Sequence, residues 1–207
     1  MFEKYLDYVK NYLIQTNGYY PPDVMYRFRC KFDHIKRVLK WCKVLENDLP
    51  EINKEALYTA AIFHDVGYGC KGKNSHAIIS AEIFAEYARD NRMDRDFAEM
   101  VTYMIKMHSN KELLGNPETM PELILLMEAD LLDEEGALRV IWYCATKAIQ
   151  GAESYSDLRD FIQMGSDKRL ENPMVTSIAR KKWDEKICLV NSFMEELTSD
   201  IDTADLL

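Results

Sequence analysis

Residues 60–69 read AAIFHDVGYG, and the apolar, helix-like run in this stretch ends in the adjacent pair His64 and Asp65. An imidazole and a carboxylate beside a buried run are costly to bury unless each has a polar partner. A divalent metal ion would satisfy both groups. Neighbouring residues on a helix point about 100° apart, so both can face one ion only near a helix end, where Gly67 and Gly69 would free the backbone. A lone His-Asp pair is more often a helix-terminal aspartate beside a hydrogen-bonded core histidine, so the rest of the sequence must decide.

The rest of the sequence predicts helices and no sheet. Apolar residues recur at helical spacing over residues 1–15, 33–45, 54–65, 75–89, 94–108, 121–132, 136–150 and 174–197. The stretch 151–173 is polar and contains Gly165 and Pro173, so we expect an irregular excursion there. A chain of 207 residues suits one domain. We therefore predict an all-α, single-domain helical bundle over residues 1–207, with a core over about 20–150, a helical extension over 151–207 and a metal at the centre.

Composition excludes several classes of protein. The formal net charge of −9 argues against binding to a nucleic-acid polymer. No run approaches the roughly 18 apolar residues that cross a membrane, and the N-terminus lacks the apolar core of a secretory signal. The five cysteines are scattered and never in Cys-x-x-Cys spacing, which is typical of reduced thiols. We expect a cytoplasmic protein that binds neither membrane nor nucleic acid; acidic helical domains of this size often dimerise, which leaves a homodimer open.

Four histidines, all at the ends or apolar edges of expected helices, are the other candidates for chemistry. With two aspartates they form a mixed imidazole and carboxylate set: His34, His64, Asp65, His76, His108 and Asp130. Such donors suit Mn, Fe, Zn, Co or Ni, whereas Mg and Ca prefer oxygen ligands alone. The set could hold one divalent transition metal ion or two, and two ions are the arrangement used for phosphoryl hydrolysis.

The order of these residues resembles the HD-domain superfamily of metal-dependent phosphohydrolases, which is named for the adjacent His-Asp pair. The segments that carry the resemblance are Phe32-Asp33-His34, Phe63-His64-Asp65-Val66-Gly67, His76 followed by Ser80-Ala81-Glu82, Met107-His108-Ser109 and Glu128-Ala129-Asp130-Leu131-Leu132-Asp133. By this resemblance the metal ligands are His34, His64, Asp65 and Asp130. His76 and His108 match further histidines that bind a second metal in some branches and contact phosphate in others.

One departure from the family concerns phosphate binding. Related nucleotide-hydrolysing members often carry a Lys directly after the distal Asp and an Arg about three turns later, where this chain has Leu131 and Trp142. The basic residues that could replace them are Lys71, Lys73, Lys106 and Arg139. Solvated surface charge is the more common role for each of these. It is also the default for three acidic residues that could orient a ligand or act as a base, namely Glu82, Glu128 and Asp133.

The resemblance implies hydrolysis of a phosphate ester or anhydride on a nucleotide or a similar small phosphorylated metabolite. The metal would lower the pKa of a water molecule and polarise the phosphoryl oxygen. Asp65, His76 and His108 would be the catalytic residues, and the two histidines, with Lys71 and Lys73, would bind the substrate phosphate. Two other functions stay open, namely a di-iron oxygenase on the same ligand set and a non-catalytic signalling or binding module that contains a metal.

Overall fold

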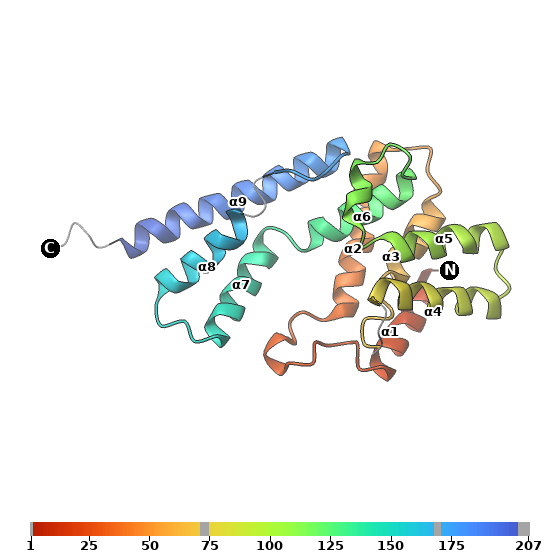
Figure 1. The fold of residues 1–207 in the computed structure, drawn as a ribbon, viewed down its shortest axis with the longest axis horizontal. Helices are drawn as coiled ribbons and strands as arrows, with labels where there is room; N and C mark the ends of the chain where they lie inside the picture. The colour runs from red at the N-terminus through yellow and green to blue at the C-terminus, as the bar shows by residue number, and fades with distance from the viewer. Residues whose placement is uncertain (1, 71–74, 168–170, 203–207) are drawn as a thin grey trace. The chain divides into compact units, whose positions relative to one another are not determined.

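The computed structural model of the protein describes residues 2–70, 75–167 and 171–202, and these ranges contain α-helices, short 3-10 turns and no strand (Figure 1). The predicted all-α fold class is therefore confirmed. The chain forms two compact units, Met1–Asp133 and Glu134–Leu207. Among the described residues, no helix combines the length and the apolar character that a membrane span needs.

The first unit is built around one short, largely buried helix. Its α-helices are α1 (Phe2–Gln15), α2 (Lys31–Leu45), α3 (Lys54–Phe63), α4 (His76–Asp90), α5 (Arg95–Met107) and α6 (Pro121–Asp133). Helix α3 packs against all five others. Its small residues Ala56, Ala60 and Ala61 are completely buried and let the neighbouring helices approach closely. The end of α3 therefore lies in the core, where α2, α4, α5 and α6 can all reach it.

An aromatic cluster fixes the last residue of α3. The ring of Phe63 is fully buried, with centroids 5.8 Å from Tyr5, 5.0 Å from Phe84 and 5.2 Å from Tyr87. These partners come from α1 and α4, so two other helices hold the position at which α3 ends. His64 follows directly, and its place in the fold is set by the packing of Phe63.

The two glycines after the His-Asp pair allow close packing. The Gly67 N–H donates to Ser80 Oγ on α4 at 2.9 Å, and a Cβ added at Gly67 would lie 2.8 Å from the Ser80 backbone nitrogen. A Cβ added at Gly18 would lie 2.6 Å from the Gly69 nitrogen. Neither Gly67 nor Gly69 has a positive φ. The expectation that they free the backbone was wrong, since they are needed because other chain segments pass so near.

The second unit contains α7 (Ala137–Ile149), α8 (Tyr155–Asp167) and α9 (Ser177–Ile201), which pack on one another. Helix α8 lies inside the stretch that we expected to be irregular, so that expectation was wrong. Ser154 and Asp157 form a capping box, because the Ser154 N–H donates to Asp157 Oδ2 at 2.9 Å and the Asp157 N–H donates to Ser154 Oγ at 3.2 Å. Ile162 then buries α8 against α7 and α9.

The packing of Phe63 generates a stability prediction. Phe63→Ala leaves a large cavity at the centre of the first unit and should lower the free energy of unfolding by about 3–5 kcal/mol. The matched control is Phe28→Ala, because Phe28 is 52% exposed; this substitution should change stability by less than about 0.5 kcal/mol. Urea unfolding followed by circular dichroism measures both. Equal losses for the two variants would contradict the central role of Phe63.

Candidate metal centre

Five helices of the first unit each bring at least one candidate ligand to the same place. His34 lies in the first turn of α2 and Asp130 lies in α6. His64 and His108 are the C-terminal cap residues of α3 and α5. His76 is the first residue of α4, and Asp65 follows the end of α3. The structure therefore brings together all six residues that the sequence singled out as a set.

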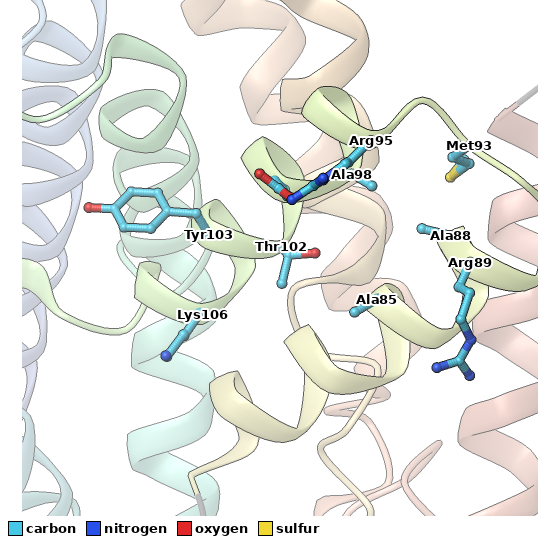
Figure 2. Close-up of a pocket in the computed structure, with 10 residues that line it drawn as sticks. Ala85, Ala88, Arg89, Met93, Arg95, Ala98, Thr102, Tyr103 and Lys106 are labelled. Atoms are coloured by element: carbon cyan, nitrogen blue, oxygen red, sulfur yellow. The ribbon is translucent and has the colours of Figure 1, made fainter.

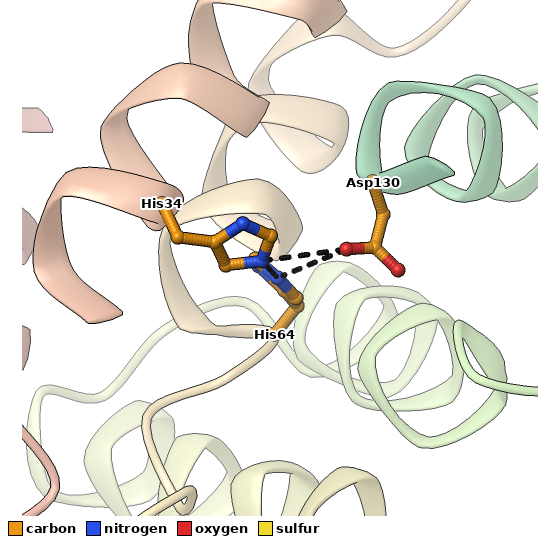
Figure 3. A group of neighbouring side chains, drawn as sticks. All are labelled: His34, His64 and Asp130. Atoms are coloured by element: carbon orange, nitrogen blue, oxygen red, sulfur yellow. Dashed lines mark hydrogen bonds and ion pairs between the residues drawn. The ribbon is translucent and has the colours of Figure 1, made fainter. Parts of the chain in front are cut away.

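The first group of donors comes from α2, the end of α3 and α6. Figure 3 shows His34, His64 and Asp130 pointing toward one another from three different helices. The two Nε2 atoms are 3.2 Å apart, and Asp130 Oδ1 lies 3.4 Å from His34 Nε2 and 4.0 Å from His64 Nε2. Asp65 adds a fourth donor, because its Oδ2 lies 3.4 Å and 3.5 Å from the same two nitrogens. Two imidazole nitrogens and two carboxylate oxygens thus converge.

The second group meets the first at Asp65. The other oxygen of this carboxylate, Oδ1, lies 3.2 Å from His76 Nε2 and 3.7 Å from His108 Nε2. The Nε2 atoms of these two histidines are 3.4 Å apart. One carboxylate therefore presents each of its oxygens to a different pair of histidines.

The hydrogen bonds of the histidines fix which ring nitrogen faces inward with a lone pair. His64 Nδ1 lies 2.8 Å from the Ala61 carbonyl and His108 Nδ1 lies 2.7 Å from the Ile105 carbonyl. A carbonyl oxygen only accepts, so each Nδ1 carries the proton and the Nε2 of the neutral ring carries a lone pair. His34 Nδ1 lies 2.7 Å from Asp133 Oδ2, another acceptor. The rings of His64 and His108 are thus held in the orientation and tautomer that a metal ligand needs, and Asp133 fixes the orientation of the His34 ring.

The donor set fits a bound cation. Asp65 Oδ1 is buried and makes no hydrogen bond within the described part of the chain. His34 Nε2 and His64 Nε2 lie 3.2 Å apart, so one ion could accept a lone pair from each ring once both are neutral. A divalent ion would also give Asp65 Oδ1 or Oδ2 a positive partner, and mixed imidazole and carboxylate donors suit Mn, Fe, Zn, Co or Ni.

The protonation states of the buried aspartates and of two histidines also fit a bound cation. Burial lowers the pKa of His64 to about 3 and also lowers the pKa of His108. Burial by itself would raise the pKa of Asp65, but Lys31 and the histidines hold it well below the ordinary value. Lys111 and His34 have the same effect on the pKa of Asp130 against the opposing effect of burial. At neutral pH the carboxylates are ionised and these two imidazoles are neutral, which are the forms that bind metal.

His34 behaves differently from the other buried histidines. Burial by itself would lower its pKa, but hydrogen bonds with Asp130, Asp133 and Asp65 raise it well above the ordinary value. Arg37 holds Asp133 in place, with Nε 2.7 Å from Oδ1 and Nη2 3.0 Å from Oδ2. Of the three acidic residues proposed as orienters, Asp133 thus contacts a ligand directly. Glu82 is exposed, whereas Glu128 is fully buried.

Two lysines at the centre were missed by the sequence reasoning. Lys31 Nζ lies 2.7 Å from Asp65 Oδ2, and Lys111 Nζ lies 2.7 Å from Asp130 Oδ2. Lys31 lies three residues before His34, and Lys111 lies three residues after His108. This helical spacing was the signal in the sequence that could have identified both lysines. Ser109 was also missed as a contact, and its Oγ lies 3.2 Å from the Nε2 atom of His76.

Four other basic residues were predicted as possible phosphate contacts. Lys71 and Lys73 lie outside the described residues and stay predictions. Lys106 lines a hollow of about 510 Å³ between α4 and α5, whose lining includes Ala85 and Thr102 and none of the six candidate ligands (Figure 2). Arg139 belongs to the second unit, where it is buried with Nη1 2.5 Å from Glu135 Oε2.

Solved structures show the same fold. An HD-superfamily hydrolase from Bacillus thuringiensis is 17% identical, with 96% of this chain and 95% of that chain covered and a TM-score of 0.65. A predicted HD superfamily hydrolase from an uncultured Thermotogales bacterium is 18% identical, with 97% and 92% covered and a TM-score of 0.64. Bacillus subtilis YpgQ in complex with ADP is 18% identical, with 98% and 96% covered and a TM-score of 0.62.

No curated protein matches the sequence. Residues 32–135, half of the chain, match the family model of the HD domain. The matched range contains all six candidate ligands and Lys111, whereas Lys31 lies directly before its first residue. The chain belongs to the HD domain family.

Proposed function

We propose that the protein is a metal-dependent phosphohydrolase that cleaves a phosphate ester or anhydride in a nucleotide or another small phosphorylated metabolite. The observation that carries the proposal is the buried Asp65 carboxylate, whose two oxygens face two different pairs of histidines. Membership of the HD domain family supports hydrolysis, as does the description of two similar structures as hydrolases. The structure of YpgQ with ADP supports nucleotides as the first substrates to test.

The first donor group would hold the first ion, with His34, His64, Asp65 and Asp130 as ligands. A divalent transition metal ion supplies Lewis acidity, which lowers the pKa of water and polarises a phosphoryl oxygen. The residues around the ion keep it in place. Asp133 accepts a hydrogen bond from His34 Nδ1. This contact fixes the ring orientation and makes the opposite nitrogen, Nε2, a stronger metal ligand.

His76 and His108 would serve the phosphate side of the reaction. The His76 side chain is 37% exposed, whereas His108 is buried, so a substrate arriving from solvent meets His76 first. The Ser109 hydroxyl lies 3.1 Å from His108 Nε2 and can exchange hydrogen bonds with both rings. Both histidines either ligate a second ion through Asp65 Oδ1 or contact the phosphate directly.

Asp65 has a defined protonation state in this proposal. Its pKa is held well below the ordinary value by Lys31 and the histidines, against burial, so the carboxylate stays ionised at neutral pH. An ionised carboxylate holds a cation and accepts a hydrogen bond from water, but it does not store a proton. The proton released in hydrolysis therefore leaves through another group.

Metal content is the first prediction. Elemental analysis of protein purified without a metal-binding tag should give one or two equivalents of a transition metal. His64→Ala removes a fully buried histidine of the first donor group and should lower the content at least about tenfold. The control Asp7→Asn changes an exposed carboxylate on α1 and should keep the metal. A wild-type protein that cannot be loaded with Mn, Fe, Zn, Co or Ni would exclude the centre.

Turnover by the metal-loaded protein is the second prediction. A panel of nucleotides and phosphate esters should include a substrate, and His76→Ala and His108→Ala should each lower kcat for it about 10²–10³-fold, because charge on the phosphate is no longer stabilised. Metal analysis of the two variants separates their roles, since ligands to a second ion would lose the same equivalent. No turnover, with oxygen consumption by the iron-loaded protein instead, would favour a di-iron oxygenase.

The third prediction concerns the outer contact of His34. Asp133→Asn weakens the acceptor for His34 Nδ1 and should raise the metal dissociation constant about 10–100-fold. The matched control is Asp33→Asn on the same helix, whose side chain is 50% exposed and pairs with Lys36. Competition with a chelator of known affinity measures both variants. If the two bind metal equally well, Asp133 does not orient His34.

A further inference from the structure

We propose that Lys31 and Lys111 form a metal-gated anion site, in which metal binding transfers Asp65 Oδ2 from Lys31 to the ion and leaves the Lys31 ammonium to bind phosphate oxygens together with Lys111. The inference deepens the proposed function and rests on it for the identity of the anion as the substrate phosphate. The proposal is based on the contacts of the two lysines with different ligand carboxylates. Lys31 contacts the Asp65 oxygen that also faces His34 and His64, whereas Lys111 contacts the Asp130 oxygen that does not.

The contact of Lys31 competes with a metal ion. Lys31 Nζ lies 2.7 Å from Asp65 Oδ2, and the same oxygen lies 3.4 Å from His34 Nε2 and 3.5 Å from His64 Nε2. An ion held by the two histidines takes Oδ2 as a ligand and carries two positive charges close to the ammonium. Repulsion between the ion and the ammonium therefore opposes the contact between Lys31 and Asp65.

The contact of Lys111 does not compete in this way. Asp130 turns Oδ1 toward His34 and His64, while Oδ2 accepts from Lys111 Nζ at 2.7 Å. The Met127 carbonyl gives the same ammonium a second acceptor at 3.3 Å. Lys111 can therefore keep its position when an ion binds to Oδ1. One lysine is released by the metal, and the other is held in place beside it.

Both ammonium groups are placed where a substrate can reach them. The Lys31 and Lys111 side chains are 15% and 29% exposed, so each lies partly buried at the edge of the centre. Tyr68 is 45% exposed, and its ring centroid lies 4.0 Å from Lys31 Nζ and 6.2 Å from the His76 ring centroid. The face of Tyr68 gives the Lys31 ammonium a second favourable contact once Asp65 is taken by the ion.

The charge balance of the centre supports the release of Lys31 by the metal. In the metal-free centre each ligand aspartate is matched by one lysine, and Asp133 is matched by Arg37. Each divalent ion adds two positive charges to this balanced set of side chains. The centre therefore becomes more positive as it is loaded, and a phosphate dianion is the ligand that this excess charge attracts.

A lysine footprint of the full-length protein tests the release directly. Acetylation by a low dose of acetic anhydride is followed for each lysine by mass spectrometry, in the metal-free and the Mn-loaded protein. Metal should raise the reactivity of Lys31 several-fold and leave Lys111 nearly unchanged. The internal control is Lys36, which pairs with Asp33 on the same helix as Lys31 and lies outside the centre. Equal reactivity of Lys31 with and without metal would overturn the gate.

Binding of inorganic phosphate tests the anion site. In calorimetric titrations of the Mn-loaded protein, Lys31→Met and Lys111→Met should each weaken phosphate binding about tenfold or more, because a charge-assisted hydrogen bond is lost. Lys36→Met should bind as the wild type does, and the metal-free wild type should bind at least tenfold more weakly than the loaded protein. Unchanged affinity in both variants would overturn the site. Thermal unfolding checks each variant, and Lys31→Gln, which also removes the charge but keeps a polar side chain, replaces Lys31→Met if the latter does not fold.

The outcomes separate this inference from the proposed function. Lysine-dependent and metal-dependent phosphate binding without turnover of any phosphate ester would retain the anion site and reject the hydrolase. Turnover with phosphate binding that ignores both lysines would retain the hydrolase and reject the anion site. Metal content measured on the same samples excludes the trivial case in which a lysine variant has lost its ion.

Discussion

The buried carboxylate of Asp65 is the constraint on which the first unit depends. It is 4% exposed, it is ionised at neutral pH, and its two oxygens point toward different pairs of histidines. An ionised group at this depth is stable only with opposite charge beside it, and removal of one partner of a buried ion pair typically costs about 3–5 kcal/mol. Lys31 fills this need at 2.7 Å, and in the proposed function a bound ion would fill it as well. The surroundings of Asp65 are therefore the reason that the centre lies at the end of the most buried helix.

The same arrangement ties the fold to the chemistry. Helices α2 to α6 each supply at least one residue of the set, so the centre forms only when all five are packed. Apolar contacts provide this packing. An example is the aromatic cluster around Phe63, the residue directly before His64. Stability and ligand placement are consequently properties of the same core.

Sequence reasoning predicted the parts that depend on local pattern. The helices of the first unit lie within about two residues of the predicted ranges, because apolar periodicity and turn residues are local signals. The clustering of the six ligands was predicted from residue types and from a resemblance to a family. Contacts between segments distant in sequence were not predictable. Lys31 reaches Asp65, 34 residues away; its spacing from His34 could have placed it near the set, but it does not show that Lys31 pairs with Asp65. Helix α8 was missed for another reason, since its polar composition outweighed the capping signal at Ser154.

The histidines differ in what holds their rings. His64 and His108 both cap helices and donate Nδ1–H to the carbonyl three residues earlier, at Ala61 and Ile105. A backbone carbonyl survives any side-chain substitution, so these two rings keep their tautomer while the surrounding sequence drifts. His34 depends instead on Asp133, a side chain 99 residues away in the sequence. Mutational tolerance is therefore uneven across the ligand set, and a chain that diverges from this one can lose the partner of His34 long before it loses the orientation of the other two.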